Sequence, residues 1–244
     1  RGQRMSLKVV IAAGGTGGHL FPGIAVAQEL KTRHAAEITF ITTPKAVTGQ
    51  ILERYGLAWE ALESRAIKGQ RLLGRVRTLF QVPGSILEAT ARLRVLEPDL
   101  VLGLGGHTAG PVGVAAYRLG IPLALHEQNA VPGLTNRYLA RLARRVFVSF
   151  PASRSFFAPD ICLWTGNPIR EEFFWAHPPR PAKPFTVLVT GGSQGAHHLN
   201  MAALEALSWL EDLKDKLHFL HLTGEDDRDR VKETYEVNGF RAEV

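Results

Sequence analysis

Short apolar runs alternate with segments of helical periodicity along most of this chain, and this alternation restricts the possible folds more than any other feature. "KVVIAA" (8–13) is apolar throughout, as strands buried on both faces of a parallel sheet are. Strands are expected at 8–13, 36–43, 99–106, 121–129, 145–150, 185–190 and 216–224. Helices are expected at 21–33, 48–56, 85–98, 110–120, 133–143, 197–213 and 227–237. This order predicts an α/β fold with a doubly wound parallel sheet.

Charge and proline content divide the chain into two parts. Residues 1–170 carry a net charge of +11 and residues 171–244 a net charge of −5. Five prolines fall within 165–184, and a new strand–loop–helix pattern follows them. We therefore predict domains at 5–166 and 185–244, joined by a linker at 167–184. The second domain, 185–244, shows fewer predicted strands than half of a doubly wound fold needs, and we expect it to be incomplete in this chain.

Two glycine-rich junctions, "IAAGGTGGH" and "LVTGGSQGA", match each other between a predicted strand and a predicted helix. Helix N-termini present unpaired N–H groups and a partial positive charge, and glycine lets a phosphate approach them closely. Thr16 and Ser193 add a hydroxyl at matching positions. The alternative is that these glycines only form tight turns. Two matched junctions support this alternative less than a single junction would.

Other nucleotide-binding and metal-binding motifs fail on particular residues. Neither glycine loop ends in the Gly-Lys-Ser/Thr of a Walker A motif. A dinucleotide fingerprint beginning at Gly15 would need glycine at Leu20 and an acid after the second strand, which ends "ITTPK". "HEQNA" has Ala130 where a zinc motif needs histidine, and there is no Asp-x-Asp motif, so we predict no metal and no cofactor.

Polar residues also follow two further predicted strands. "GLGGHTAGP" (103–111) is a third glycine loop, and "LHEQN" (125–129) ends a strand with His126 and Glu127. Ligands of open parallel sheets bind outside the carboxyl ends of the strands. These residues are therefore candidates for a site, although a hydrogen-bonded structural pair explains His126 and Glu127 equally well.

Residues 64–87 contain no Asp or Glu and mix basic with aliphatic side chains. With Phe80 as the only aromatic residue, this pattern fits an anionic membrane surface better than nucleic acid. A solvated helix face is the alternative. The predicted membrane contacts are Lys68, Arg71, Leu72, Leu73, Arg75, Leu79 and Phe80. A second group extends the basic surface: Arg137, Arg141, Arg144 and Arg145.

Five motifs together resemble the MurG family of N-acetylglucosamine transferases, and they cover nearly the whole chain in family order. They are "GGTGGHLFPGIAVA", "LGLGGHTAGP", "LHEQNAVPGLTN", "TGNPIR" and "GGSQGAHHLN". The resemblance implies a GT-B fold, with two Rossmann-like domains facing each other across a cleft. It implies inverting transfer of GlcNAc from UDP-GlcNAc to the muramyl C4 hydroxyl of lipid I, giving lipid II. It also implies a peripheral location on the cytoplasmic side of the cell membrane, with UDP-GlcNAc and lipid I as partners and no nucleic acid.

The resemblance also assigns roles to residues of this sequence. His19 and Glu127 correspond to candidate catalytic residues, with His19 as the expected base, since its unperturbed pKa lies near 6.5. The corresponding substrate contacts are Thr16, Gly17, Gly18, His126, Asn129, Arg170, Ser193, Gln194 and Gly195.

Two departures from the family pattern bear on these expectations. His107 stands where many relatives carry tyrosine, and the later C-terminal motifs that hold the donor do not occur in this sequence. The chain is therefore expected to be inactive by itself. The alternatives are another GT-B enzyme that uses a UDP-sugar, such as a glycolipid glucosyltransferase or a UDP-GlcNAc 2-epimerase, and a non-catalytic membrane-docked fragment that binds anions.

Overall fold

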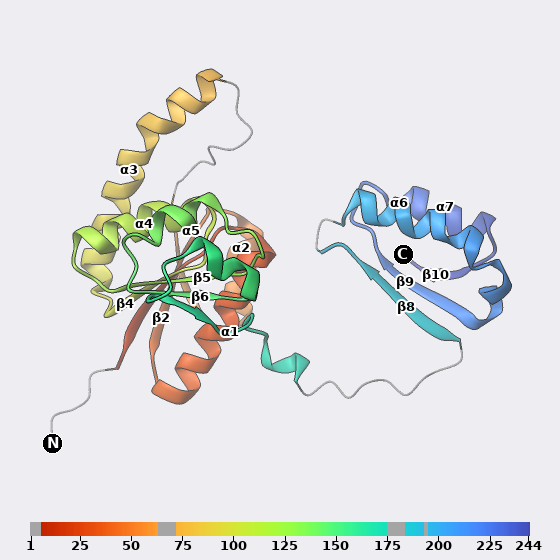
Figure 1. Ribbon diagram of the computed structural model, residues 1–244, viewed down its shortest axis with the longest axis horizontal. Coiled ribbons are helices and arrows are strands. Elements are labelled where there is room, and N and C mark those ends of the chain that lie inside the picture. Colours follow the sequence, from red (N-terminus) through yellow and green to blue (C-terminus); the bar gives the residue numbers. More distant parts are fainter. Residues whose placement is uncertain (1–5, 63–71, 175–183, 193–194) are drawn as a thin grey trace. The chain divides into compact units, whose positions relative to one another are not determined.

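The computed structural model describes residues 6–62, 72–174, 184–192 and 195–244, with residues 72–82 described as a helix path only. The chain divides into two compact units, Arg1–Trp175 and Ala176–Val244, and each is described by itself (Figure 1). The division falls inside the segment 167–184 that the sequence predicts as a linker.

The first unit is built on a seven-stranded, fully parallel sheet in the order β3-β2-β1-β4-β5-β6-β7. Its strands are β1 (Lys8–Ala12), β2 (Glu37–Thr42), β3 (Ala58–Ala61), β4 (Leu100–Gly103), β5 (Leu123–Glu127), β6 (Arg145–Val148) and β7 (Cys162–Trp164). The strand order reverses between β1 and β4, which makes the carboxyl ends of these two strands the switch point of the sheet. The predicted doubly wound parallel sheet is confirmed.

Helices cover both faces of this sheet, and Figure 1 shows α1 and α4 on opposite sides of it. The helices are α1 (Gly17–His34), α2 (Ala46–Arg54), α3 (Leu72–Leu96), α4 (Gly106–Arg118) and α5 (Leu134–Leu139), with 3-10 helices η1 (Pro151–Phe156) and η2 (Glu171–Phe173). Alternate residues of β1 serve the two cores: Val9 and Ile11 pack toward α1 and α2, and Val10 and Ala12 toward α3, α4 and α5. A buried residue such as Ile11 contributes roughly 2 kcal/mol.

The second unit has a smaller parallel sheet in the order β10-β9-β8, with α6 and α7 on the same side of it in Figure 1. Its elements are β8 (Phe185–Thr190), α6 (His197–Glu205), η3 (Ala206–Trp209), η4 (Glu211–Lys216), β9 (Leu217–Leu222), α7 (Arg228–Val237) and β10 (Arg241–Glu243). Phe219 and Tyr235 lie at the centre of its core, with ring centroids 5.0 Å apart.

Several element boundaries predicted from sequence are wrong. The helix expected to begin at 85 begins at Leu72 and continues through Pro83, because one missing N–H does not outweigh the packing of its second half on α4. The helix expected at 197–213 ends at Glu205 and gives way to the 3-10 helices η3 and η4. The short strands β3, β7 and β10 were not predicted, since each has only three or four residues and lies at an edge of its sheet.

Candidate active site

The candidate site lies at the switch point of the first unit, where two glycine loops come into contact. A Cβ atom added to Gly106 would lie 2.9 Å from the Cα of Gly14, so only glycine permits this approach. Gly105 and Gly106 also have positive φ angles of 89° and 77°, a backbone region that favours glycine. The loops after β1 and β4 therefore form one continuous surface at the edge of the sheet.

Helix α1 begins in the first of these loops with its first amides available for a ligand. The carbonyl of Thr16 accepts hydrogen bonds from the amides of His19 and Leu20, both at 3.0 Å. The amides of Gly17 and Gly18 precede these first bonds, and the first turn contains no acidic residue. Gly18 has open space where a side chain would be. The positive end of α1 is thus suited to an anion.

His19 lies between the two loops. Its Nδ1 is 2.8 Å from Thr16 Oγ1, and its ring lies against Gly105. Burial is the main cause that lowers the pKa of His19 below 6.5, Glu127 opposes this shift, and His107 adds to it. His19 is therefore a neutral imidazole near pH 7, the form that can accept a proton.

Glu127, at the end of β5, is 1% exposed, and four hydrogen bonds hold its carboxylate. Oε1 accepts from the backbone amide and the side-chain amide of Asn129, both at 2.9 Å. Oε2 accepts from the Gly133 amide at 3.1 Å and from Asn136 Nδ2 at 2.9 Å. The carboxylate thus fixes the loop between β5 and α5 and orients Asn129.

His126 is buried, and both of its ring nitrogens bond to protein groups. Its Nε2 lies 3.2 Å from the Gly166 carbonyl, and Gln128 Nε2 lies 3.1 Å from its Nδ1. Because a carbonyl only accepts, Nε2 carries the proton and Nδ1 accepts from Gln128. Burial is the main cause that lowers the pKa of His126. Among the described residues, Gly166 and Gln128 thus hold the His126 ring, and the Glu127 carboxylate bonds to other groups, so the two side chains are not hydrogen-bonded to each other.

Arg170, from the predicted linker, lies against the first unit. Its guanidinium stands 4.1 Å above the ring of Phe21 and 5.0 Å from that of Phe173, and it donates to the Tyr55 hydroxyl at 3.1 Å. Phe21 in turn approaches Gly17 at the start of α1. Stacking and the hydrogen bond therefore hold this positive charge near the start of α1.

The second glycine loop precedes α6, and of its three predicted contacts the structure describes one. Ser193 and Gln194 lie outside the described residues. Gly195 has a φ of 71°, and a Cβ atom there would lie 1.7 Å from the Thr223 carbonyl oxygen. The loop thus packs directly on the backbone that follows β9.

A chain of polar residues supports this second loop from the core. The Tyr235 hydroxyl lies 3.0 Å from His221 Nδ1, and His221 Nε2 lies 3.1 Å from Asn200 Oδ1. Asn200 Nδ2 donates to the Thr223 carbonyl at 2.9 Å and to Asp227 at 2.7 Å, and His197 pairs with Asp227 at 2.9 Å. These bonds join α6, α7 and the segment between β9 and α7.

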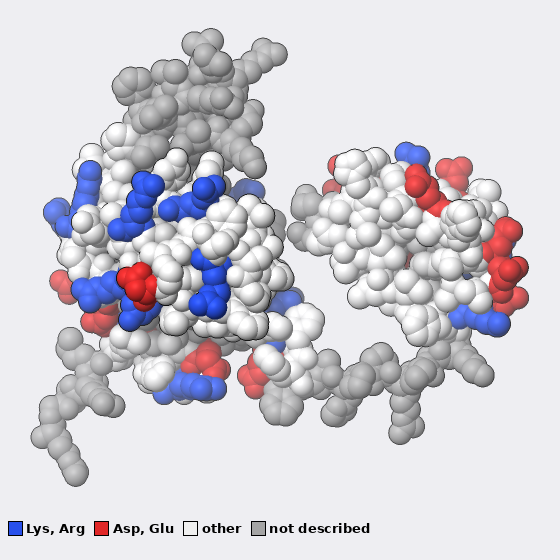
Figure 2. Space-filling view, viewed as in Figure 1, with Lys and Arg blue, Asp and Glu red and all other residues white. Residues whose placement is uncertain are grey.

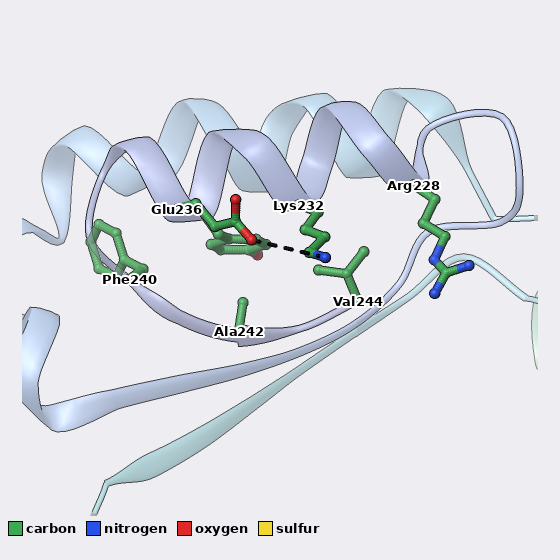
Figure 3. A pocket seen from close by; sticks show the side chains of 7 residues that line it. Arg228, Lys232, Glu236, Phe240, Ala242 and Val244 are labelled. Carbon is green, nitrogen blue, oxygen red and sulfur yellow. Dashed lines mark ion pairs between the residues drawn. The ribbon is translucent and has the colours of Figure 1, made fainter.

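A surface hollow of about 100 Å³ lies between α7 and β10 (Figure 3). Its charged residues include Lys232 and Glu236, an exposed pair whose Nζ and Oε1 atoms are 4.0 Å apart and which contributes little. No predicted site residue lines it, and we assign it no function.

The side chains of the predicted membrane contacts lie outside the part of the chain that the structure describes. Lys68 and Arg71 lie outside the described residues, and no side chain is described for Leu72, Leu73, Arg75, Leu79 and Phe80, which lie on α3. Within the described parts of the chain, no helix is both long and apolar enough to span a bilayer. The same residues include no group of three or more His, Cys, Asp or Glu placed to hold a metal ion.

The structure adds residues to the site that sequence reasoning missed. Lys45 and Thr43 follow β2 and lie against Gly15 in the first glycine loop. Asn136 joins the Glu127 network from α5. The available signal was the stretch "ITTPK", which places a threonine and a lysine at the carboxyl end of β2.

Comparison with known proteins gives a consistent family. Residues 9–148 match the glycosyltransferase family 28 N-terminal domain, and residues 186–243 match its C-terminal domain. A UDP-N-acetylglucosamine--N-acetylmuramyl-(pentapeptide) pyrophosphoryl-undecaprenol N-acetylglucosamine transferase of Geotalea uraniireducens is 44% identical over 98% of this chain and 67% of its own length.

Solved structures agree with this family assignment. The MurG of Acinetobacter baumannii has a TM-score of 0.69 at 30% identity, covering 98% of this chain and 65% of its own. A UDP-GlcNAc 2-epimerase from Neisseria meningitidis bound to UDP-GlcNAc has a TM-score of 0.66 at 16% identity, covering 97% and 72%, and shows the fold alone. The chain spans 63 to 68% of the length of the curated relatives it matches. On the two domain matches and the whole-chain identity, the chain belongs to glycosyltransferase family 28 and, within it, to the MurG family.

Proposed function

We propose that this chain serves the inverting transfer of GlcNAc from UDP-GlcNAc to the muramyl C4 hydroxyl of lipid I, which forms lipid II. The names and whole-chain identity of its relatives support this assignment. The observation that carries it in this chain is the position of His19 at the start of α1, where its ring lies against Gly105 and its Nδ1 is 2.8 Å from Thr16 Oγ1.

In the proposed reaction His19 removes the proton of the acceptor hydroxyl. When Nδ1 donates its hydrogen to Thr16 Oγ1, the lone pair of Nε2 is free to accept that proton. The negative charge of Glu127 favours the imidazolium that forms, since it raises the pKa of His19. With both of its oxygens engaged in hydrogen bonds, Glu127 acts as a positioning residue and not as the base.

The remaining predicted contacts other than His126 keep binding roles in this proposal. The amides at Thr16, Gly17 and Gly18 bind an acceptor phosphate at the start of α1. Asn129 and Arg170, together with Ser193, Gln194 and Gly195, contact the donor. Arg170 adds a positive charge that favours the leaving UDP.

Transfer of labelled GlcNAc to a soluble lipid I analogue tests the proposal. The assay uses this chain alone and a chimera that continues with the remaining part of the Geotalea uraniireducens relative. His19→Ala is expected to lower kcat by about 10²–10⁴-fold, the range of general-base catalysis. His34→Ala, at the exposed end of α1, is the matched control. A chimera that transfers GlcNAc equally well with and without His19 would refute the role of His19. Conversion of UDP-GlcNAc to its C2 epimer with no glycosylated acceptor would instead indicate an epimerase reaction.

We also propose that a surface around α5 binds the anionic inner face of the cytoplasmic membrane. This α5 surface consists of Val131, Leu134, Arg137, Tyr138 and Arg141, all exposed. Arg141 lies 6.0 Å from the Tyr138 ring centroid, so cation and apolar groups are interleaved. Figure 2 shows Lys and Arg side chains spread over this face of the first unit. Such a mixture of groups suits anionic headgroups above an apolar interior.

Co-sedimentation with phosphatidylglycerol vesicles tests the α5 surface. Each basic residue near an anionic bilayer contributes about 1 kcal/mol, so Arg137→Ser with Arg141→Ser should weaken binding about thirtyfold. Arg33→Ser with Arg54→Ser removes the same charge from α1 and α2 and should have little effect. Equal losses in the two double variants would show a response to net charge alone.

A further inference from the structure

Gly15, Thr43 and Lys45 form a small cradle where β1 and β2 end, which we call the anion cradle. A Cβ atom on Gly15 would lie 2.1 Å from Thr43 Oγ1 and 3.4 Å from Lys45 Cδ. The absence of a side chain at Gly15 therefore lets the hydroxyl and the lysine stem lie against the backbone of the first glycine loop.

The polar groups of the cradle have unused hydrogen-bonding capacity. Thr43 is 3% exposed, and its Oγ1 has no hydrogen-bond partner among the described residues. A buried hydroxyl without a partner is costly and uncommon in folded proteins. Lys45 is exposed and makes no ion pair within the described parts of the chain.

The electrostatic surroundings of the cradle are positive. Lys45 is the N-cap residue of the nine-residue helix α2, and α1 begins two residues after Gly15. The first turns of α1, α2 and α4 contain no acidic residue. Burial, and then the charge of Lys45, lower the pKa of His107 at the start of α4. A nearby anion would thus meet a cation and the positive ends of helices whose first turns contain no acidic residue.

We infer that the anion cradle binds one phosphate group of the acceptor's diphosphate, an inference that rests on the proposed function. The Lys45 ammonium donates to a phosphate oxygen from the side of β2, while the amides of α1 donate from the other side. The Thr43 hydroxyl is buried in the free protein. When a phosphate enters between Gly15 and Lys45, Thr43 Oγ1 donates to the same phosphate.

Binding of inorganic pyrophosphate to the 244-residue chain tests the cradle without requiring transfer. Affinity is measured by calorimetry, and the amide shifts of Gly15 to Gly18 locate the ligand. Lys45→Met should weaken binding about tenfold, the effect of one charge-assisted hydrogen bond, and Lys45→Arg should restore most of it. Lys31→Met, near the other end of α1, is the charge-matched control and should change affinity less than twofold.

Thr43→Val should weaken pyrophosphate binding about threefold. It should also leave the unfolding midpoint unchanged or raised, because it removes a buried hydroxyl that has no partner. Thr42→Val is the matched control, since the Thr42 hydroxyl is also buried without a partner among the described residues. It should affect stability similarly and leave affinity unchanged.

The outcomes separate this inference from the proposed function. Unchanged pyrophosphate affinity in Lys45→Met overturns the cradle, whether or not the protein transfers GlcNAc. A tenfold loss supports the cradle even if no transfer is detected. In the active chimera, Lys45→Met should raise the KM for the lipid I analogue about tenfold and leave the KM for UDP-GlcNAc within twofold. A raised donor KM alone would assign the cradle to the donor and overturn the acceptor assignment.

Discussion

The two glycine-rich loops have similar sequences, but the glycines at their matching positions, Gly18 and Gly195, have different surroundings. In the second unit, the space beside Gly195 is filled by the Thr223 carbonyl, so glycine there allows close packing of the protein on itself. In the first unit, the space beside Gly18 is open and Gly15 borders the anion cradle. A shared motif therefore does not by itself show whether its glycines make room for a ligand or for the backbone.

The buried polar networks near the two loops differ as well. In the first unit, the buried carboxylate of Glu127 accepts four hydrogen bonds from Asn129, Gly133 and Asn136. Behind the second loop, His221, Tyr235 and Asn200 form a buried polar chain that ends at Asp227. A buried charge depends more strongly on its partners than neutral groups do. The two units should consequently respond differently to mutation and to pH.

The largest expected effect is on the second loop. Gly195→Ala should destabilise the second unit by more than about 3 kcal/mol, because the new Cβ would collide with the Thr223 carbonyl at a positive φ. Gly192→Ala, also at positive φ but in open space, should cost only about 1 kcal/mol. Hydrogen exchange of the β8 and β9 amides measures both. Equal protection in the two variants would contradict the packing role of Gly195.

Glu127→Gln should destabilise the first unit by about 3 kcal/mol. The NH₂ group of the new side chain would face N–H groups whose hydrogen bonds a carboxylate oxygen now accepts. It should also lower the pKa of His19, because the favourable charge of Glu127 is lost. Urea unfolding and an NMR titration of His19 measure the two effects. The control, Glu29→Gln, changes an exposed α1 residue that pairs with Arg33. An unchanged His19 titration would show that Glu127 does not act on this histidine.

Acid should weaken the first unit before the second. Burial lowers the folded-state pKa of His19, His107 and His126 in the first unit and of His221 in the second. A lowered histidine pKa means that the unfolded chain binds more protons, so stability falls as pH drops below about 6.5 toward the folded pKa. Hydrogen exchange at about pH 7.5 and about pH 5.5 should therefore show a larger loss in the first unit. Equal losses would indicate that the three histidines of the first unit contribute no more to its loss of stability in acid than His221 contributes in the second unit.

The smallest expected change in stability is at Gly18. Gly18→Ala should stabilise α1 by up to about 1 kcal/mol, because alanine is the better helix former and its side chain would point into open space. The same methyl group should hinder a phosphate at the first amides and weaken pyrophosphate binding. Thermal unfolding and calorimetry measure the two effects, which should have opposite signs. A stabilised variant with unchanged affinity would place the ligand elsewhere.

Sequence patterns predicted the long, strongly apolar elements well and the short or exposed ones poorly. β1, β5 and β8 were expected within a few residues of their observed bounds, since strands such as β1 and β5 are apolar and buried. β10 has exposed residues at both ends and carries no apolar pattern to detect. The sequence pattern predicts that α3 begins at 85, whereas the helix begins at Leu72, because Pro83 weakens the local helical signal although packing further along retains the helix.

The sequence by itself determined that this chain is a two-part α/β protein with glycine loops at strand ends, because side-chain periodicity and glycine placement are local properties. It also identified the family, since five spaced motifs rarely coincide. Tertiary structure decided which strand ends are neighbours, and so brought Lys45 to Gly15 and Arg170 to Phe21. It also decided that the carboxylate of Glu127 is saturated and that the hydroxyl of Thr43 has no partner among the described residues. Such contacts depend on strand order and burial. Both are determined jointly by residues that lie far apart in the sequence.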